Sequence, residues 1–568
     1  MAAQLRSRWQ WLIPLGIGLG LLYPVLCTDR SYASDWGNHM WLIHMQGLDL
    51  SGLGEPGYYL DSTLGFFYPY FAFYGGSMYT VLGVVSQLGS PNLAMVVVIA
   101  AAIALNFGGW LWIARLAGLD GWWAMLPGAI AVTTPYAVSN MYARGDIPEM
   151  LATSAIPLAA AAGLSCLREP QLRFWTAAAF VGALAVLTGT HTLTLIWGTT
   201  FLLMFAVVLA ASDWRGARAH LRRGLRLVWL GLLGIALNAW ILIPLLLYHQ
   251  RLREGGPDEL SFTNVTEPAQ LFSVLRHSAS LNPDITADLN TQLPVLALAW
   301  ALVGGVACWL LLPRSRKLLA AGLAAILGVF LLLILEPSLI DKLPTTWRYI
   351  QFPYRLVTYA DLAVVGLVTV VLVAMKRAGT FGRVAVWLLA AIAAFGFAQS
   401  LAQNSDARSF LPNRSVAVES SFTPPPTWYA PLQFADASAP EVEPTLRRPL
   451  IIAPESGDHE SYTVSYPPGR AGSAETNVFT WTYLVDVKGA DPVGITSEGN
   501  MVVRLPASDR PRPVTFSQHW EAPVTVGRWI SLLAIVEVLL LSALAAYGFL
   551  RRRDPSGEGG AEAPPEPL

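Results

Sequence analysis

Long apolar stretches follow one another along most of the chain, separated by short polar or charged turns. A helix needs about 20 apolar residues to cross the hydrocarbon core of a membrane. Windows of roughly that length lie at residues 10–27, 68–88, 93–115, 122–140, 149–167, 174–190, 192–211, 225–248, 292–312, 318–336, 356–375, 383–401 and 528–550. The pattern predicts an α-helical polytopic membrane protein.

Basic residues test whether every window crosses, because Lys and Arg in short loops stay on the cytoplasmic side. If 68–88 crosses, the clusters of Lys and Arg at 215–226 and 314–317 lie on the outer side, against this rule. If 68–88 instead stays at the outer face as a re-entrant or interfacial helix, every short basic loop is cytoplasmic. No Lys or Arg occurs between Ser31 and Ala114, which favours the second arrangement. The sequence therefore predicts about 12 transmembrane helices in the plasma (inner) membrane, with both termini cytoplasmic and the first span an uncleaved signal anchor.

This topology divides the chain into four parts. Residues 1–401 form a multi-span membrane domain, whose outer loop 28–92 contains juxtamembrane helices. Residues 402–527 change character to Pro-rich sequence followed by short alternating runs at 462–466, 478–487 and 501–505, which predicts a small extracytoplasmic domain resembling a β-sandwich. A final transmembrane helix over 528–550 and a disordered cytoplasmic tail over 551–568 complete the chain.

Composition narrows the possible partners. Only 13% of the residues are charged and 54% are hydrophobic, whereas a soluble domain carries about 25% charged residues, so membrane lipids are the expected surroundings. The net charge of -1 gives no basic face for a phosphate backbone, which excludes nucleic acid as a partner. Cys27, Cys166 and Cys308 show no metal-site or disulfide spacing.

Candidate chemistry begins directly after the first span. Asp35 and His39 are four residues apart and share one face of a helix. A partly desolvated carboxylate at Asp35 is suited to act as a general base. The alternative is that Asp35 only caps a surface helix.

A second group is the run from Tyr142 to Glu149, which places Arg144, Asp146 and Glu149 within six residues at the end of a span. Ionisable groups at membrane depth often mark a substrate pathway. Snorkelling of Arg144 and capping by the acidic residues explain the same sequence equally well.

A third group contains Arg348 and Arg355 in an aromatic-rich segment, together with His191 between Thr190 and Thr192. The guanidinium fork is shaped to hold a lipid phosphate, although an interfacial belt of aromatic and basic residues has the same composition. A lone histidine such as His191 is more often structural than functional. The sequence contains no nucleotide-binding loop, no G-x-S-x-G and no H-E-x-x-H.

These motifs, in this order, resemble the GT-C superfamily of membrane glycosyltransferases. The Asp35-Trp36-x-x-His39 element, the Tyr-x-Arg-Gly-Asp-x-x-Glu element at 142–149 and the Gln-Phe-Pro-Tyr-Arg element at 351–355 are similar to a bacterial branch of YfhO-like and pyruvoyl-tetrahydropterin-synthase-related membrane proteins. The chain departs from the pattern at Tyr70, where a second proline is common, and it has no D-x-D in the outer turn.

The resemblance implies a GT-C-like fold and an inverting transferase that moves a sugar from a polyprenyl-phosphate donor to an extracytoplasmic envelope glycan or lipid acceptor. Asp35 would be the catalytic base. Arg144, Arg348 and Arg355 would stabilise the departing phosphate. The remaining substrate-binding residues would be His39, Tyr142, Asp146, Glu149 and His191. No cofactor is certain, and the absent D-x-D leaves a divalent metal as an open question.

Two other classes of function fit the sequence. A transporter or flippase for a lipid-linked precursor is expected to carry charged or broken helices near mid-membrane, in paired halves. A non-catalytic envelope assembly protein is expected to use the β-rich domain for binding, with the ionisable groups serving only structure.

Overall fold

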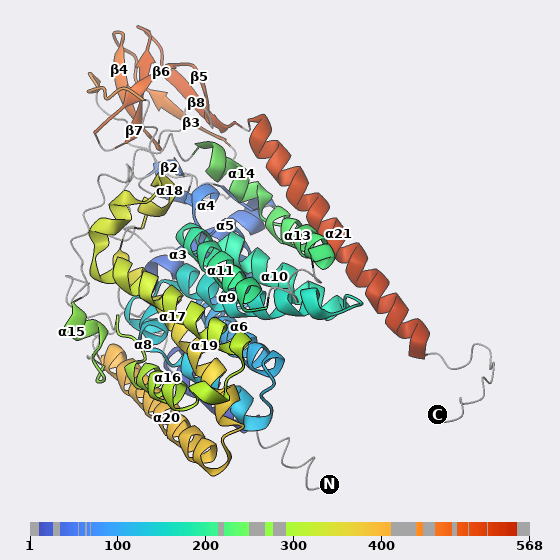
Figure 1. Ribbon diagram of the computed structural model, residues 1–568. Coiled ribbons are helices and arrows are strands. Elements are labelled where there is room, and N and C mark those ends of the chain that lie inside the picture. Colours follow the sequence, from blue (N-terminus) through green and yellow to red (C-terminus); the bar gives the residue numbers. More distant parts are fainter. Residues whose placement is uncertain are drawn as a thin grey trace.

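The computed structural model in Figure 1 describes residues 11–26, 35–54, 56–58, 60–62, 65–68, 70–213, 221–248, 267–276, 291–350, 352–409, 439–446, 461–479, 485–497, 499–519 and 521–553. Most of these residues are helical, and a small group of strands lies beyond one end of the helical bundle.

The helices that build the bundle occur in this order: α2 (Leu12–Leu26), α3 (Trp36–Leu53), α4 (Tyr70–Phe73), α5 (Gly76–Leu88), α6 (Pro91–Leu116), α7 (Leu126–Val132), α8 (Pro135–Val138), α9 (Ile147–Arg168), α10 (Phe174–Thr190), α11 (Thr192–Ser212), α13 (Leu221–Ala236), α14 (Ala239–Tyr248), α16 (Val295–Ala307), α17 (Arg314–Leu335), α18 (Thr345–Arg348), α19 (Val357–Met375), α20 (Gly379–Ser409) and α21 (Ala522–Arg553). Polar capping residues and prolines determine where several of these helices begin. Ser90 accepts a hydrogen bond from the backbone N–H of Leu93, and Pro91 opens α6.

Among the described residues, seven helices are long and apolar enough to cross a membrane, and the bent pair α13–α14 makes eight if it is one span. The shorter apolar helices Leu12–Leu26, Gly121–Val132, Phe174–Thr190 and Val295–Ala307 fall within four further predicted windows. The protein is therefore a multi-pass membrane protein by its candidate spans, while the number twelve stays a prediction. Helix α19 lies at the centre of the bundle and buries every residue except Thr358.

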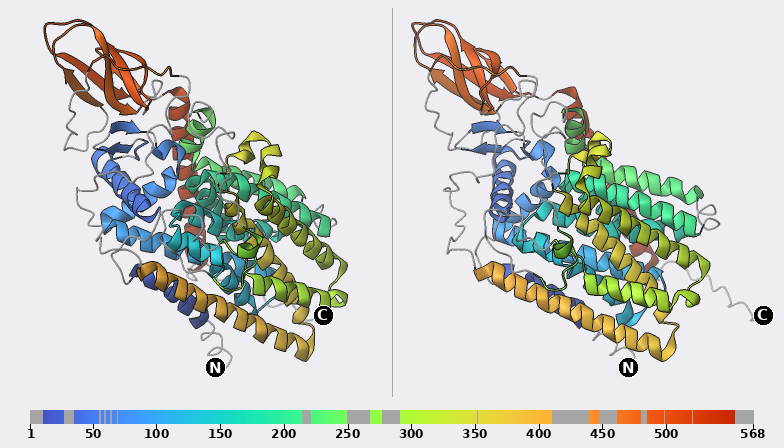
Figure 2. Two further views of the ribbon diagram at one scale, coloured as in Figure 1. Left: turned by 90° about the vertical axis from the view of Figure 1, so that its left-hand side faces the viewer. Right: turned by 60° about the vertical axis from the view of Figure 1, so that its left-hand side comes forward.

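The segment 68–88, predicted not to cross, is broken in the structure. Helix α4 ends at Phe73, Gly75 adopts a left-handed conformation with φ of 63°, and α5 then runs for 13 residues. Helix α5 packs against α3 and α6, and α4 and α5 lie on the side of the bundle that faces the strands (Figures 1 and 2). The segment is not among the candidate spans, because the bend at Gly75 leaves no helix of sufficient length.

Two three-stranded antiparallel sheets form the C-terminal β region. One contains β4 (Gly472–Phe479), β7 (Asn500–Leu505) and β6 (Asp491–Ile495), and the other contains β3 (Ser461–Tyr466), β8 (Arg512–Gln518) and β5 (Val485–Lys488). Their inner faces share a buried core, and the Tyr466 hydroxyl of β3 donates to the Glu475 carbonyl of β4 at 3.1 Å. The strands predicted at 462–466 and 501–505 are confirmed. The prediction of one strand over 478–487 is wrong, because β4 ends at Phe479 and β5 begins at Val485 in the opposite sheet.

Two strands in the predicted outer loop 28–92 also join this β region. The sequence did not predict these strands. Strands β1 (Leu60–Ser62) and β2 (Gly65–Tyr68) pair with each other, and β2 pairs in parallel with β4 through Phe66 and Val478. Helix α21 runs from the strands along the bundle (Figure 1). Its Ser531 hydroxyl donates to the Ala236 carbonyl and accepts from the Trp240 N–H, both at 3.0 Å, at the break between α13 and α14.

Two predicted boundaries shift. Helix α20 continues to Ser409 rather than ending at 401, and α21 begins at Ala522 rather than at 528. The predicted windows counted only apolar residues, whereas a helix continues through polar ones such as Gln403, which accepts from Arg276 at 3.4 Å. The tail beyond residue 553 lies outside the described residues.

Candidate functional site

A tight turn before α9 carries most of the candidate residues. One π-helical turn, η2 (Ser139–Ala143), ends at Arg144, and Gly145 follows with φ of 72°. Asp146 then caps α9 by accepting a hydrogen bond from the Glu149 N–H at 3.0 Å. A left-handed glycine and an acidic cap place Arg144, Asp146 and Glu149 on the same side of this turn.

Arg144 is bound to both carboxylates. Its Nη2 lies 2.7 Å from Asp146 Oδ2, and its Nη1 lies 2.8 Å from Glu149 Oε2. The other oxygen of Glu149 accepts from the Tyr136 hydroxyl at 2.8 Å and from Asn140 Nδ2 at 3.1 Å. All five side chains are buried, so the hydrogen bonds compensate the loss of hydration.

Arg355 and His191 complete this group from distant parts of the chain. Arg355 comes from the short helix η6 (Pro353–Leu356) at the start of α19, and His191 separates α10 from α11. Arg355 Nη1 lies 3.5 Å from Glu149 Oε2, and its Nη2 lies 3.9 Å from Asp146 Oδ2. The same Nη1 lies 3.3 Å from His191 Nε2. We call Tyr136, Asn140, Arg144, Asp146, Glu149, His191 and Arg355 the arginine–carboxylate cluster.

The charges of the cluster balance, since two guanidinium groups face two carboxylates. Burial raises the pKa of Asp146, but the adjacent charge of Arg144 outweighs that effect and holds the pKa well below its usual range. Burial lowers the pKa of His191 to about 4, so its imidazole is neutral near pH 7. Nδ1 of His191 accepts from the backbone N–H of Thr194 at 3.2 Å and lies 2.7 Å from the Thr194 hydroxyl.

Asp35 lies at the edge of the cluster. Its backbone N–H donates to the Arg144 carbonyl at 3.0 Å. The residue occupies the N-cap position of α3, but its side chain makes no capping hydrogen bond, so the capping interpretation does not describe it. Asp35 as a residue is half-buried, and burial of its carboxyl group raises the pKa to about 6 against the opposing charge of Arg144. Asp35 is therefore the acidic residue beside the cluster with solvent access and a base strength suited to proton transfer.

His39 lies one helical turn beyond Asp35 and is buried. Its Nδ1 lies 2.7 Å from the Tyr79 hydroxyl, and its Nε2 has no hydrogen-bond partner among the described residues. Burial lowers the pKa of His39 to about 4. A neutral imidazole with one unbonded nitrogen can bind a polar group that approaches Asp35.

Two predicted substrate-binding residues lie elsewhere. The Tyr142 ring stacks on Trp36 at 5.9 Å, and its hydroxyl donates to the Leu21 carbonyl at 2.6 Å, so it connects α2 with α3. Arg348 is partly buried and donates to Thr345 in its own short helix at 3.2 Å. Sequence reasoning missed Tyr136 and Asn140, although they lie eight and four residues before Arg144, a helical spacing that would have identified them.

A divalent metal has a candidate ligand set within the cluster. Asp146, Glu149 and His191 offer ligand atoms that lie within 4.8 Å of one another. Both carboxylates, however, already bind Arg144 and Arg355. A metal ion would have to displace a guanidinium group, so the described arrangement does not fit one.

Comparison with known proteins adds no relative: no protein-family model matches the chain, and no curated protein matches its sequence.

Proposed function

We propose that the chain is a membrane glycosyltransferase of the GT-C type, in which Asp35 is the general base. One observation carries the proposal: Asp35, a half-buried residue whose side chain makes no capping bond, lies directly beside a buried cluster that contains two arginines. The order of the motifs, which resembles that superfamily, supports the same conclusion.

In the proposed reaction, Asp35 takes the proton of an acceptor hydroxyl on an envelope glycan or lipid. The acceptor oxygen then attacks the anomeric carbon of a polyprenyl-phosphate sugar, the bond from that carbon to the phosphate oxygen breaks, and the polyprenyl phosphate leaves with inversion. Arg355 is the better candidate for stabilising the departing charge, because its carboxylate distances of 3.5 and 3.9 Å are longer than those of Arg144 at 2.7 and 2.8 Å. Arg144 instead positions the turn.

The proposed topology places twelve spans in the plasma membrane, with both termini in the cytoplasm and with Asp35 and the β region outside. Single cysteines introduced at exposed Glu443 in the β region and exposed Arg314 at the start of α17 would test it in a cysteine-free background. A membrane-impermeant maleimide applied to intact cells is expected to label the first and not the second.

The activity test uses the full chain purified in detergent and reconstituted in liposomes. Radiolabelled polyprenyl-phosphate mannose and glucose serve as donors, with an envelope lipid extract as acceptor. Transfer by the wild type is expected to increase with pH through about 6, as Asp35 loses its proton. Asp35→Asn is expected to lower turnover at least ~100-fold, whereas Asp120→Asn, at an exposed carboxylate that binds Lys376, should retain it.

The bent pair α13–α14 favours a second candidate function. These helices meet at an angle of 80°, and broken helices are typical of transporters. Translocation of a fluorescent polyprenyl-phosphate lipid in the same liposomes, without any transfer of sugar to the acceptor, would favour a flippase over the transferase.

A further inference from the structure

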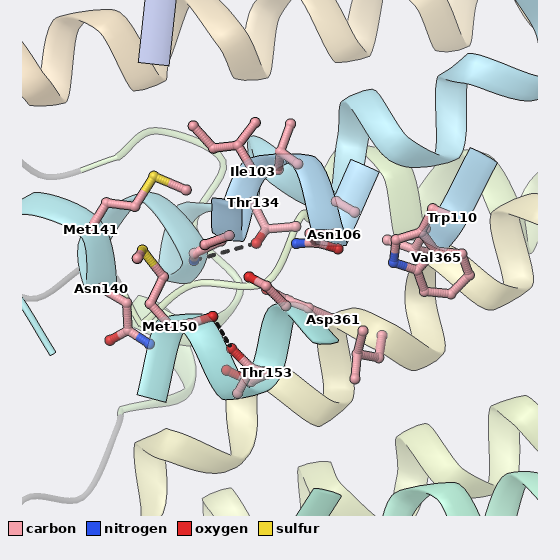
Figure 3. Close-up of a pocket in the computed structure, with 17 residues that line it drawn as sticks. Ile103, Asn106, Trp110, Thr134, Asn140, Met141, Met150, Thr153, Asp361 and Val365 are labelled. Carbon is pink, nitrogen blue, oxygen red and sulfur yellow. Dashed lines mark hydrogen bonds between the residues drawn. The ribbon is translucent and has the colours of Figure 1, made fainter. Parts of the chain in front are cut away.

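A second polar site lies inside the bundle, in a cavity of about 40 Å³ between α6, α8, α9 and α19 (Figure 3). Apolar side chains such as Ile103 and Val365 form part of its wall, but Asn106, Trp110, Thr134 and Asp361 also line it. A cavity needs about 10 to 15 Å³ to hold one water molecule. The cavity therefore has room for an ion and one or two water molecules.

Asp361 is the charged residue of this cavity. It lies within the candidate span Pro353–Met375 and is 6% exposed. Among the described residues, its Oδ1 has no hydrogen-bond partner and no Lys or Arg lies at ion-pair distance from it. Arg276 acts on Asp361 electrostatically, but its guanidinium group donates to the Ser400 hydroxyl at 2.7 Å and to the Thr133 carbonyl. An unpaired carboxylate at this depth is costly.

Neutral polar atoms surround this carboxylate. The Thr134 hydroxyl donates to it, and Figure 3 shows the carboxyl group directed toward Thr134. Asn106 Oδ1 and Trp110 Nε1, both from α6, are buried without a hydrogen-bond partner among the described residues. Asn140 Oδ1, whose side chain also lines the cavity, is unpartnered in the same sense. Buried polar groups of native proteins are nearly always satisfied, so these atoms point to a bound species.

We propose that this cavity binds one small monovalent cation of the size of Na⁺, held by the Asp361 carboxylate, the Thr134 hydroxyl and the Asn106 amide oxygen. One carboxylate balances a single positive charge, whereas sites for Ca²⁺ and Mg²⁺ usually add further carboxylates or several waters. Carboxylate, hydroxyl and amide oxygens are the ligands that hard cations prefer. Water in the remaining space would accept from Trp110 Nε1. This cation site does not depend on the proposed transferase activity.

The test measures ion-specific stabilisation of the purified full chain in detergent. Thermal unfolding is followed by tryptophan fluorescence in NaCl, KCl, LiCl or choline chloride at equal ionic strength. A cation that binds only the folded chain raises the unfolding temperature in a saturable way, and we expect a rise of roughly 2 to 5 °C in NaCl over choline chloride. Equilibrium binding of ²²Na⁺ to the same protein is expected to be saturable.

Three variants locate the effect. Asp361→Asn should abolish both the shift and the binding of ²²Na⁺, and Asn106→Leu should raise the half-saturating concentration at least tenfold. Asp120→Asn, at an exposed carboxylate, should respond as the wild type does. Asn106→Leu keeps the test decisive if Asp361→Asn does not fold.

Equal stability of the wild type in choline chloride and in all three alkali chlorides, without ²²Na⁺ binding, would overturn the proposal in favour of a protonated Asp361 with water. A larger shift in CaCl₂ than in NaCl would overturn the monovalent assignment.

Discussion

The arginine–carboxylate cluster and the Asp361 cavity are polar sites on the same two helices, and they differ in how charge is compensated. Glu149 and Thr153 lie one turn apart on α9, and Arg355 precedes Asp361 by six residues, or about 9 Å of helix. In the cluster, Asp146 and Glu149 each have a guanidinium nitrogen of both arginines within 4 Å. In the cavity, Asp361 has no such partner among the described residues.

This difference separates two uses of a buried charge. A closed network of two cations and two anions fixes the relative positions of the segments that contribute to it, here the turn before α9, the α10–α11 junction and the start of α19. An uncompensated carboxylate beside unpartnered amide oxygens instead provides ligands for something that is not part of the chain. Asn140 lies at both sites, since its Nδ2 donates to Glu149 while its Oδ1 is unpartnered.

The largest loss of stability is expected when an ion pair of the arginine–carboxylate cluster is removed. Arg144→Met leaves Asp146 and Glu149 buried with only the longer ion pairs to Arg355, and breaking a buried ion pair on one side typically destabilises a protein by about 3 to 5 kcal/mol. The free energy of unfolding, measured by denaturant titration in detergent, is expected to fall by that amount. Arg348→Met, at a partly buried arginine in α18, is the matched control and should lose less than about 1 kcal/mol.

The same measurement on the cavity completes this comparison. In sodium-free choline buffer, Asp361→Asn is expected to change the free energy of unfolding by less than about 1 kcal/mol or to increase it, because no buried cation loses its partner. A loss for Asp361→Asn as large as that for Arg144→Met would show that the two sites are compensated alike, contrary to the described contacts.

A smaller loss of stability than for Arg144→Met is expected at Gly145, in the turn between the cluster and α3. Gly145 adopts φ of 72°, and a Cβ there would lie 2.9 Å from the Trp36 backbone nitrogen. Gly145→Ala is therefore expected to reduce the free energy of unfolding by about 2 to 3 kcal/mol, from backbone strain together with displacement of α3.

Gly118→Ala is the control for strain alone, because Gly118 has φ of 96° and nothing within 4 Å of its Cβ position. The free energy of unfolding of the Gly118→Ala variant is expected to fall by about 1 kcal/mol. Equal losses for the two variants would mean that contact between the turn and Trp36 contributes nothing measurable to stability.

Hydrophobic pattern was enough to predict a helical protein with many candidate membrane spans, because span length is a local property of the sequence. The segment 68–88, predicted not to cross, is not among those spans. Strands were also predicted at 462–466 and 501–505, within one residue of β3 and β7. The pattern missed the pairing of β2 with β4, which joins residues about 400 positions apart. It also missed that β4 ends at Phe479 and that β5 begins at Val485 in the other sheet, since alternation within a strand does not specify the sheet to which it belongs.

The candidate site was predicted in part for similar reasons. Clustering within the sequence identified Arg144, Asp146 and Glu149, and the spacing of Asp35 from the first span placed it nearby. The contacts of Arg355 and His191 with these residues depend on how α10, α11 and α19 pack, which no local pattern encodes. Asp361 was overlooked even though an acidic residue within an apolar window is itself a signal of function.

A small, pH-dependent effect on the free energy of unfolding is expected at Asp35, which lies between the closed cluster and solvent. The pKa of Asp35 is raised from 3.8 to about 6 by burial, so the folded chain holds this proton more tightly than the unfolded chain does. Stability from this residue is fully present below about pH 4 and is lost as the pH rises to about 6. Partial exposure reduces the effect to about 1 kcal/mol.

The measurement is the difference in unfolding free energy between wild type and Asp35→Asn at pH 4.5, 5.5, 6.5 and 7.5, because other acidic groups cancel in that difference. The variant is expected to gain relative stability across the first three values and to change little at the last. Asp120→Asn, at an exposed carboxylate, should show no such trend. A flat difference for Asp35→Asn would mean that its carboxyl group is as well solvated as that of Asp120, which would remove the physical reason for assigning it the role of base.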